Sequence, residues 1–397
     1  MSATLTRPLA APAQTALASA PPPAGSQSDE AQSPLARLTP EQIEQLGREF
    51  DAIHDEVFAD LGERDASYIR NTIKLHRCLV LAARVLLLGS RRRPLWLTGT
   101  AALSVAKILE NMEIGHNVLH GQWDWMNDPD INSRNWDWDT ASPADAWRHS
   151  HNYEHHTFTN IRGKDRDLGY EIMRVDPHQR WHPIYLLQPL YNLLLMAFFE
   201  WGVAVHDLNA EAVLSGEKSR RQVTDELKAI GVKARRQVVK DYIAFPALSR
   251  RSWRSTLAAN FTANIVRNVW AHSIIFCGHF PDQTYTFGED EVAEETRGGW
   301  YVRQLLGAAN IDGRPLFHLL AGNLSFQVEH HLFPDMPSNR YAEIAPRVRD
   351  ICRRYELPYN TGPLRKQLGT VHRTILRLAL PGGRPRPKPG AYRPQPS

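Results

Sequence analysis

Histidine is concentrated in three short clusters, and these clusters constrain the chain more than any other feature of its sequence. The chain has 17 histidines, and ten of them lie in the clusters or at His272 and His279. The clusters read GHNVLHGQWDW, HSHNYEHHTFTN and QVEHH, at residues 115–125, 149–160 and 327–331. Neutral imidazole is the most common protein ligand for zinc, copper, iron and nickel. The pattern therefore indicates a metal site.

The spacing within each cluster suits convergence on a metal, because residues three or four apart share one face of a helix. Two pairs stand at i and i+4, His116 with His120 and His151 with His155. The last cluster places Gln327, His330 and His331 at i, i+3 and i+4. A single pair of this kind is weak evidence, since most are ordinary surface or core histidines. Three clusters, each near an apolar segment, favour metal binding.

The number of imidazoles predicts two metal ions. One ion takes about four ligands, or three and a water, and seven or more converging histidines exceed that number. The ligand set is rich in nitrogen and has no thiolate, so the residues alone leave iron, zinc and copper open.

With its flanking sequence, the pattern resembles the membrane-bound fatty acid desaturases that carry three histidine boxes. The flanks KILENMEIGHNVLHGQWDWMNDP, NVWAHSIIFCGHFPD and NLSFQVEHHLFPDMPSNRY are most similar to the mycobacterial and actinobacterial acyl-CoA (stearoyl-CoA 9-) desaturases. The similarity runs from about Leu38 to about Leu380. It implies an all-α integral membrane protein with about four transmembrane helices and a cytosolic helical cap that holds a dimetal site.

The resemblance also implies a reaction and a cofactor. Two Fe ions in a non-haem di-iron centre activate O2, and two hydrogens leave neighbouring methylenes of an acyl chain to give a cis double bond. The implied substrate is a fatty acyl-CoA or acyl-lipid, with a saturated acyl-CoA desaturated at the 9-position as the expected case. Catalytic and metal-binding roles carry over to seven histidines: His116, His120, His151, His155, His156, His330 and His331.

The family uses one more histidine near the end of its last membrane helix, and His279 is the expected eighth metal ligand. His272, two turns earlier, and Asn268, four residues before it, are further candidates. Gln327 stands where animal stearoyl-CoA desaturases carry a histidine. It is therefore a candidate oxygen ligand or a neighbour of a ligand.

The electron donor is expected to be a separate protein. The sequence has no GxGxxG dinucleotide fingerprint and no haem-binding HPGG motif. The resemblance implies an NADPH-dependent iron–sulfur flavoprotein reductase. A net charge of +4 suits a membrane surface or an anionic acyl carrier. The sequence has no basic stripe interleaved with aromatic residues, so it does not indicate a nucleic-acid partner. The three cysteines form no CxxC pair, which is typical of reduced thiols.

Four apolar segments are candidates to cross a lipid bilayer, which takes about 20 mostly apolar residues. They are Leu79–Leu88, Leu95–Ile108, Pro183–Val205 and Leu257–Phe280. Four crossings place all three boxes on the side of the N-terminus. This predicts a multi-pass protein of the inner (plasma) membrane with its active site facing the cytoplasm. The charges of Arg91, Arg92 and Arg93, and of the basic stretch 218–254, oppose this topology under the positive-inside rule.

The chain divides into one domain and two tails. Residues 1–38 are rich in Ala, Pro, Ser and Gln, and residues 381–397 are basic and proline-rich, so both are predicted to be disordered. Residues 39–380 form the predicted desaturase domain. Thr39 and Gln42 form a capping box that should open an amphipathic helix.

Two other readings remain at this stage. A lipid hydroxylase of the same superfamily would share the metals and differ in the fate of the substrate radical. A membrane metal-binding protein would need polar ligands within several long spans. Here the ligands lie mostly at segment ends and in loops, which favours a site that faces one side.

Overall fold

The computed structural model describes residues 33–384, 386 and 388, and its regular structure is almost entirely helical. The longer helices are α1 (Pro40–Ala59), α2 (Glu63–Leu88), α3 (Arg93–Ile108), α7 (Gln188–Ala197), α8 (Phe199–His206), α10 (Arg220–Val238), α12 (Trp253–His279), α13 (Arg297–Gly307), α16 (Tyr341–Arg354) and α17 (Leu364–Ala379). The short helices are α4 (Asn117–Leu119), α5 (Ala144–Trp147), α6 (His156–Phe158), α9 (Ala210–Leu214), α11 (Phe245–Leu248), α14 (Pro315–Leu320) and α15 (Gln327–Leu332). Two parallel strands, β1 (Asn310–Asp312) and β2 (Thr361–Pro363), pair in register Asn310 to Thr361.

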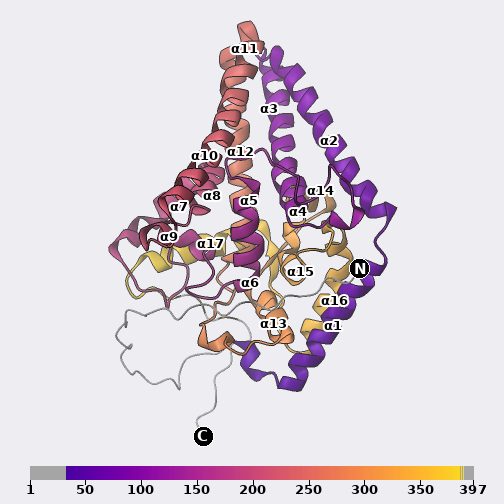
Figure 1. Ribbon diagram of the computed structural model, residues 1–397, viewed down its shortest axis with the longest axis vertical. Helices are drawn as coiled ribbons and strands as arrows, with labels where there is room; N and C mark the ends of the chain where they lie inside the picture. The colour runs from indigo at the N-terminus through magenta and orange to yellow at the C-terminus, as the bar shows by residue number, and fades with distance from the viewer. Residues whose placement is uncertain (1–32, 385, 387, 389–397) are drawn as a thin grey trace.

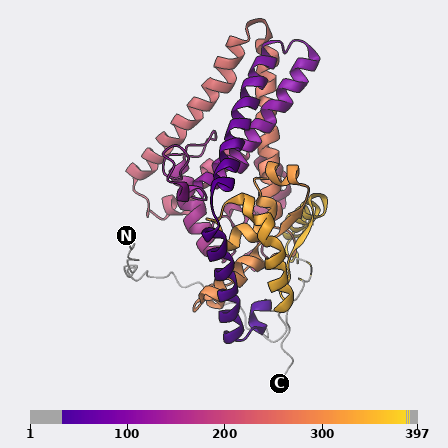
Figure 2. The same ribbon diagram turned by 90° about the vertical axis from the view of Figure 1, so that its right-hand side faces the viewer.

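The molecule tapers from a broad base to a narrow tip (Figure 1). Helices α2 and α3 rise to the tip as a hairpin, and α10 and α12 meet there through α11. In the view turned by 90° (Figure 2), α10 leans away from the other three towards its N-terminal end. Hydrogen bonds join the two turns at the tip, from Ser252 Oγ to the Leu88 carbonyl (2.8 Å) and from Trp96 Nε1 to the Ser255 carbonyl (2.9 Å).

Helices α1, α13, α15 and α16 form the base, which we call the cap. The predicted capping box is confirmed, because Thr39 Oγ1 accepts from the Gln42 amide (3.2 Å) and Gln42 Oε1 accepts from the Thr39 amide (2.9 Å). Helix α1 packs its apolar face into the core of the cap. A Cβ on Gly298 of α13 would lie 2.0 Å from the Ile43 carbonyl oxygen, so only glycine permits this crossing of α1 and α13.

The interior of the bundle is polar near α12. Asp241 accepts from Lys107 Nζ (2.7 Å) and forms an ion pair with Arg84 (3.0 Å). Asn260 accepts from Arg84 (2.6 Å), and Asn264 donates to the Tyr242 hydroxyl (2.8 Å). These polar groups join α12 to its neighbouring helices, where the hydrogen bonds offset the cost of burying them.

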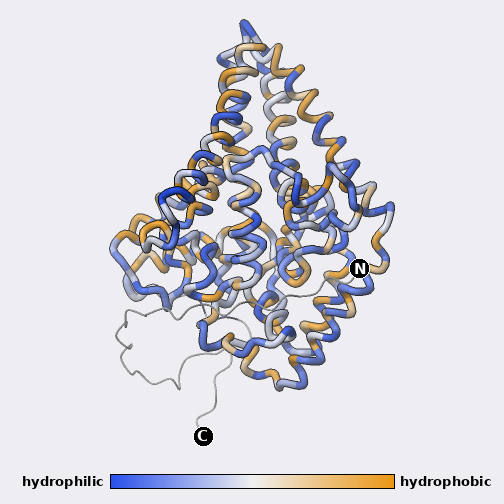
Figure 3. Tube along the Cα trace, viewed as in Figure 1, coloured by the Kyte–Doolittle hydropathy of each residue, from blue (hydrophilic) through white to orange (hydrophobic). Residues whose placement is uncertain are grey.

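No single helix in the described part of the chain is both long and apolar enough to cross a membrane. Figure 3 shows apolar and polar residues alternating along the bundle helices. The segment Pro183–Val205, predicted as one continuous span, is broken at Phe198. The pair Pro183–Ala197 and Phe199–His206 passes the length and composition test only together, with a bend of 103°. Asn268 Nδ2 donates to the Ala197 carbonyl (3.0 Å), which satisfies a backbone group that the break frees.

The tail boundaries also differ from the sequence prediction in part. Residues 1–32 of the predicted N-terminal tail lie outside the described residues. Pro34–Arg37, inside that predicted tail, form a short 3₁₀ helix, and Leu35 and Leu38 pack against the core of the cap. Most of the predicted C-terminal tail, from residue 389 on, also lies outside the described residues.

Candidate metal centre

The first two histidine clusters lie on π-helical turns. Leu109–His116 forms a π-helix that continues α3, and Arg148–His155 forms another that continues α5. A π-turn holds more residues than an α-turn and often marks a functional site. Gly115 permits the first of these turns, since a Cβ there would lie 2.8 Å from the Glu110 carbonyl oxygen. The third cluster lies on the short α15.

These elements bring eight imidazoles together in the interior. The nearest ring nitrogens of His116, His120, His151 and His330 lie within 4.8 Å of one another. Those of His155, His279 and His331 form a second group within the same limit. The ring of His156 lies between the groups, with its centroid 4.8 Å from that of His120 and 4.5 Å from that of His331. The geometry therefore contains two neighbouring ligand sets.

Five of these histidines have Nδ1 next to a hydrogen-bond acceptor. The pairs are His116 with Asn117 Oδ1 (3.0 Å), His151 with Asp167 Oδ2 (3.2 Å), His155 with Asp165 Oδ1 (3.0 Å), His330 with the Tyr341 hydroxyl (3.1 Å) and His331 with Gln304 Oε1 (2.9 Å).

The surroundings fix the direction of these bonds. The Gln304 amide nitrogen donates to the His156 carbonyl (3.0 Å), so its oxygen faces His331. The Asn117 amide nitrogen donates to the Gly322 carbonyl (3.2 Å), so its oxygen faces His116. The Tyr341 hydroxyl donates to the Phe333 carbonyl (3.2 Å) and accepts from its histidine. Each Nδ1 is therefore the donor, and each Nε2 keeps a free lone pair.

Most of the inward ring nitrogens have no hydrogen-bond partner among the residues that the structure describes. Nε2 is buried without a hydrogen bond in six histidines of the site: His120, His151, His155, His156, His330 and His331. Leaving so many buried acceptors unpaired would be costly, whereas metal ions would satisfy them together. The donor set fits two transition-metal ions, because each group offers three or four neutral imidazoles.

Burial keeps these imidazoles neutral, which is the form that binds metal. It lowers the pKa of His116 to about 3, with a further contribution from the charge of His151. Burial likewise places the pKa values of four others well below the usual range: His120, His156, His330 and His331. For His155, burial lowers the pKa, but the Asp165 carboxylate outweighs it and the net shift is upward.

The other candidates from the sequence lie in different surroundings. Gln327 Nε2 is 3.1 Å from His279 Nε2, and its Oε1 has no partner, so Gln327 borders the second group. His272 turns away from the eight imidazoles, hydrogen-bonds Asn192 (3.1 Å) and stacks on Phe276. It precedes His279 by seven residues, about 10 Å along the helix. Asn268 is bound to the Ala197 carbonyl.

The sequence did not identify the residues that accept hydrogen bonds from the Nδ1 atoms. Asp165 and Asp167 carried a usable signal, since these two carboxylates lie shortly after the second cluster and carboxylates commonly orient metal-binding histidines. Asp167 also accepts from His206 Nε2 (2.9 Å). Gln304 and Tyr341 lie on α13 and at the start of α16, and no local motif distinguishes them.

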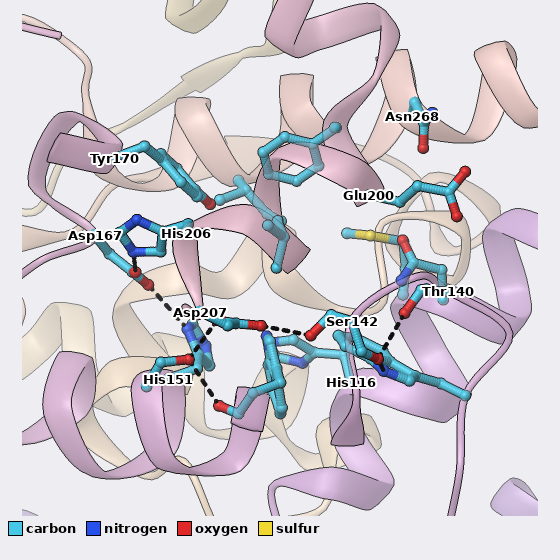
Figure 4. Close-up of a pocket in the computed structure, with 18 of the residues that line it drawn as sticks. His116, Thr140, Ser142, His151, Asp167, Tyr170, Glu200, His206, Asp207 and Asn268 are labelled. Carbon is cyan, nitrogen blue, oxygen red and sulfur yellow. Dashed lines mark hydrogen bonds and ion pairs between the residues drawn. The ribbon is translucent and has the colours of Figure 1, made fainter. Parts of the chain in front are cut away.

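A cavity lies beside the imidazoles (Figure 4). His116, His151 and His279 line it on the side of the histidine clusters. One wall is polar, where Asp207 accepts from Ser142 (2.5 Å) and Ser150 (2.7 Å). The apolar lining includes Met112, Trp138, Trp147, Phe199, Ile275 and Leu324. An apolar lining with a few polar groups is typical of small-molecule sites.

The site and the sequence together define a class of protein. Residues 94–363 match the fatty acid desaturase family, and the chain belongs to that family. It is therefore an enzyme that desaturates fatty acyl chains.

The match lies within residues 39–380, and the chain aligns with relatives along most of its length. It is 49% identical over 351 residues to the NADPH-dependent stearoyl-CoA 9-desaturase of Mycobacterium tuberculosis, covering 87% of this chain and 82% of that protein. It is 25% identical to the sn-1 linoleoyl-lipid 6-desaturase of Synechocystis sp., covering 68% and 76%. It is 26% identical to the Delta(5) fatty acid desaturase A of Dictyostelium discoideum, covering 64% and 57%.

Proposed function

We propose that this protein introduces a cis double bond at the 9-position of a saturated acyl-CoA, using O2 and electrons from a separate NADPH-dependent iron–sulfur flavoprotein reductase. The observation that carries the proposal is the set of eight imidazoles beside a cavity, of which all but the partly buried His151 are buried. The 49% identity to a protein named NADPH-dependent stearoyl-CoA 9-desaturase supports the substrate, the position and the source of electrons.

The metals in this proposal are two iron ions. His116, His120, His151 and His330 would hold one ion, and His155, His279 and His331 the other, with His156 between the groups. When bound, the two irons supply the O2-derived oxidant that no side chain provides. The overall reaction is balanced when the alkyl chain, O2, two electrons and two protons give the alkene and two waters.

The residues of the chain orient the substrate in this scheme. The apolar lining of the cavity, including Phe199 and Ile275, suits the methylenes of an acyl chain. His116 and His279 line the same cavity, so methylenes held there lie close to both ligand groups. Water has little room beside a bound chain, which protects reactive intermediates from side reactions.

A multi-pass location in the inner (plasma) membrane, with the site facing the cytoplasm, is part of the proposal. Several bundle helices expose large apolar side chains: Leu81, Val85 and Leu88 on α2, Leu97 on α3, Leu190, Leu193 and Leu194 on α7, and Phe261, Val266 and Val269 on α12. Exposed apolar surface of this extent is typical of contact with lipid. His279 is the last residue of α12, at the end of this helix away from the tip, and the other candidate metal ligands surround it there.

The test is fatty acid analysis by gas chromatography–mass spectrometry of a bacterial host that expresses the chain with a compatible reductase. Wild type and His330→Ala are compared, and disulfide adducts locate the double bonds. The proposal predicts new monoenes with a 9-position double bond in wild type only. Hydroxylated chains would favour the hydroxylase reading, and double bonds at another position would contradict the proposed regiochemistry.

A further inference from the structure

The cap carries an acidic groove between α1 and α13. Its lining includes six carboxylates: Glu44, Asp51, Asp290, Glu291, Glu294 and Glu295. Only two basic residues, Arg48 and Arg297, line it as well. Arg162 and Arg303, outside the lining, pair with Glu291 (3.5 Å) and Glu295 (2.7 Å), so the excess negative charge of the groove rests on the remaining carboxylates.

The two arginines do not neutralise the whole groove. Arg48 forms an ion pair with Glu44 (2.7 Å), and Arg297 lies 3.6 Å from Asp51. Asp290 and Glu294 are exposed, and neither forms an ion pair or a side-chain hydrogen bond with the part of the chain that the structure describes. Exposed unpaired charge attracts a partner of opposite sign and guides its approach.

The groove is connected to the metal centre through α13. Arg297 and Gly298 line the groove at the start of this helix, and Gln304, seven residues later, holds His331 Nδ1 (2.9 Å). Seven helical residues span about 10 Å. A partner in the groove would therefore lie close to a metal-binding histidine.

A second connection runs through buried Arg303. It binds Glu295 at the groove (2.7 Å) and donates to the Thr157 (2.9 Å) and Thr159 (3.0 Å) carbonyls. Both threonines lie within three residues after His156, the last histidine of the second cluster. The same arginine thus ties the groove to the backbone next to His156.

We propose that this acidic groove is the docking surface for the electron donor, a redox protein that presents a basic face. The inference rests on the proposed function, in which electrons come from a separate reductase. Each turnover takes two electrons from NADPH through that protein. O2 is reduced to two waters, which take up two solvent protons and the two hydrogens removed from the substrate. A partner bound at the tip would lie much farther from the metal centre, because the 27 residues of α12 separate the tip from His279 by about 40 Å.

The experiment uses the metal-loaded full-length protein with an NADPH-dependent iron–sulfur flavoprotein reductase as the probe. The variant Asp290→Lys/Glu294→Lys reverses two unpaired charges of the groove. The control Glu211→Lys/Glu217→Lys makes the same change of charge at two exposed carboxylates outside it. Steady-state turnover gives KM for the reductase and kcat for each protein. A separate single-turnover assay starts from enzyme fully reduced by dithionite, to which O2 and stearoyl-CoA are added.

The groove variant should raise KM for the reductase by about tenfold or more, because docking loses charge complementarity. Its single-turnover yield of monoene should equal that of wild type, which also establishes that it is folded and loaded. The control should stay within about twofold of wild type, and the wild-type KM should rise with added salt.

A groove variant within about twofold of wild type, or an equal rise in KM for the control, would overturn the docking site. Absence of monoene from pre-reduced wild type would instead contradict the proposed desaturation itself, so the two failures are distinguishable.

Discussion

At the scale of single residues, the site is built by hydrogen bonds to the outer nitrogen of each ring. Tyr341, Gln304, Asn117 and the two aspartates each accept from an Nδ1–H, which fixes the tautomer and the direction of the ring. The histidines could be found from the sequence because their spacing is local. Most of their partners could not, because contacts such as His331 with Gln304 depend on the tertiary fold.

Replacement of a metal-facing histidine should abolish desaturation, whereas a neighbouring exposed histidine should be dispensable. His330→Ala and His155→Ala each remove a buried inward Nε2. In the matched control, His149→Ala, the side chain is 69% exposed and pairs with Glu154. Monoene yield by gas chromatography should fall to background for the first two variants and stay within about twofold of wild type for the control. An equal loss in His149→Ala would contradict the assignment of the second cluster.

Tyr341→Phe should lower the metal affinity of the site without leaving a cavity in the core. It removes the acceptor of His330 Nδ1 and keeps the ring. Loss of such a partner typically costs about 10–100-fold in metal affinity or activity, so iron retained after dialysis against a chelator should fall. The control Tyr355→Phe removes a hydroxyl that binds Glu49 (2.9 Å), far from the site. Equal iron retention in Tyr341→Phe and wild type would show that this bond does not orient His330.

At the scale of elements, the histidine clusters depend on π-turns that the sequence did not reveal. The i, i+4 spacing predicts an α-helical face, and the structure has π-helices ending at His116 and His155. The periodicity of the residues cannot distinguish an α-helix from a π-helix, because the choice depends on tertiary packing, such as that of the Trp138 side chain beside Gly115. The opening of α1 was predictable because its capping box is local. The break at Phe198 was not, because α12 stabilises it through Asn268.

Gly115→Ala should therefore disrupt the first cluster. Its Cβ would meet the Glu110 carbonyl oxygen at 2.8 Å and the Trp138 side chain at 3.1 Å. Overpacking of this kind costs about 1–3 kcal/mol, so the thermal unfolding temperature and the iron content should both fall. Gly231→Ala in α10 is the control, since nothing lies within 4 Å of its Cβ. It should be neutral or stabilising by about 0.5–1 kcal/mol. An unchanged unfolding temperature and iron content in Gly115→Ala would contradict the conclusion that this π-turn requires glycine.

At the scale of the whole molecule, segments far apart in the chain assemble one site. The ligand groups combine residues from both ends of α4, from α6 and its preceding π-turn, from the end of α12 and from α15. The sequence predicted this convergence and the helical class, because both follow from residue spacing and family resemblance. It also predicted four membrane crossings, and this stays a prediction, because weakly apolar helices and buried ion pairs such as Lys107 with Asp241 give a mixed signal.

The central claim is that eight imidazoles hold two iron ions, and metal analysis of the purified protein tests it most directly. Mass spectrometry of total metal, combined with Mössbauer spectroscopy of iron-57-loaded protein, gives the number and identity of the ions. The account predicts two irons per chain in wild type, as a pair of neighbouring sites, and clear loss of iron in His330→Ala. A single iron per chain, or zinc in place of iron in active enzyme, would contradict it.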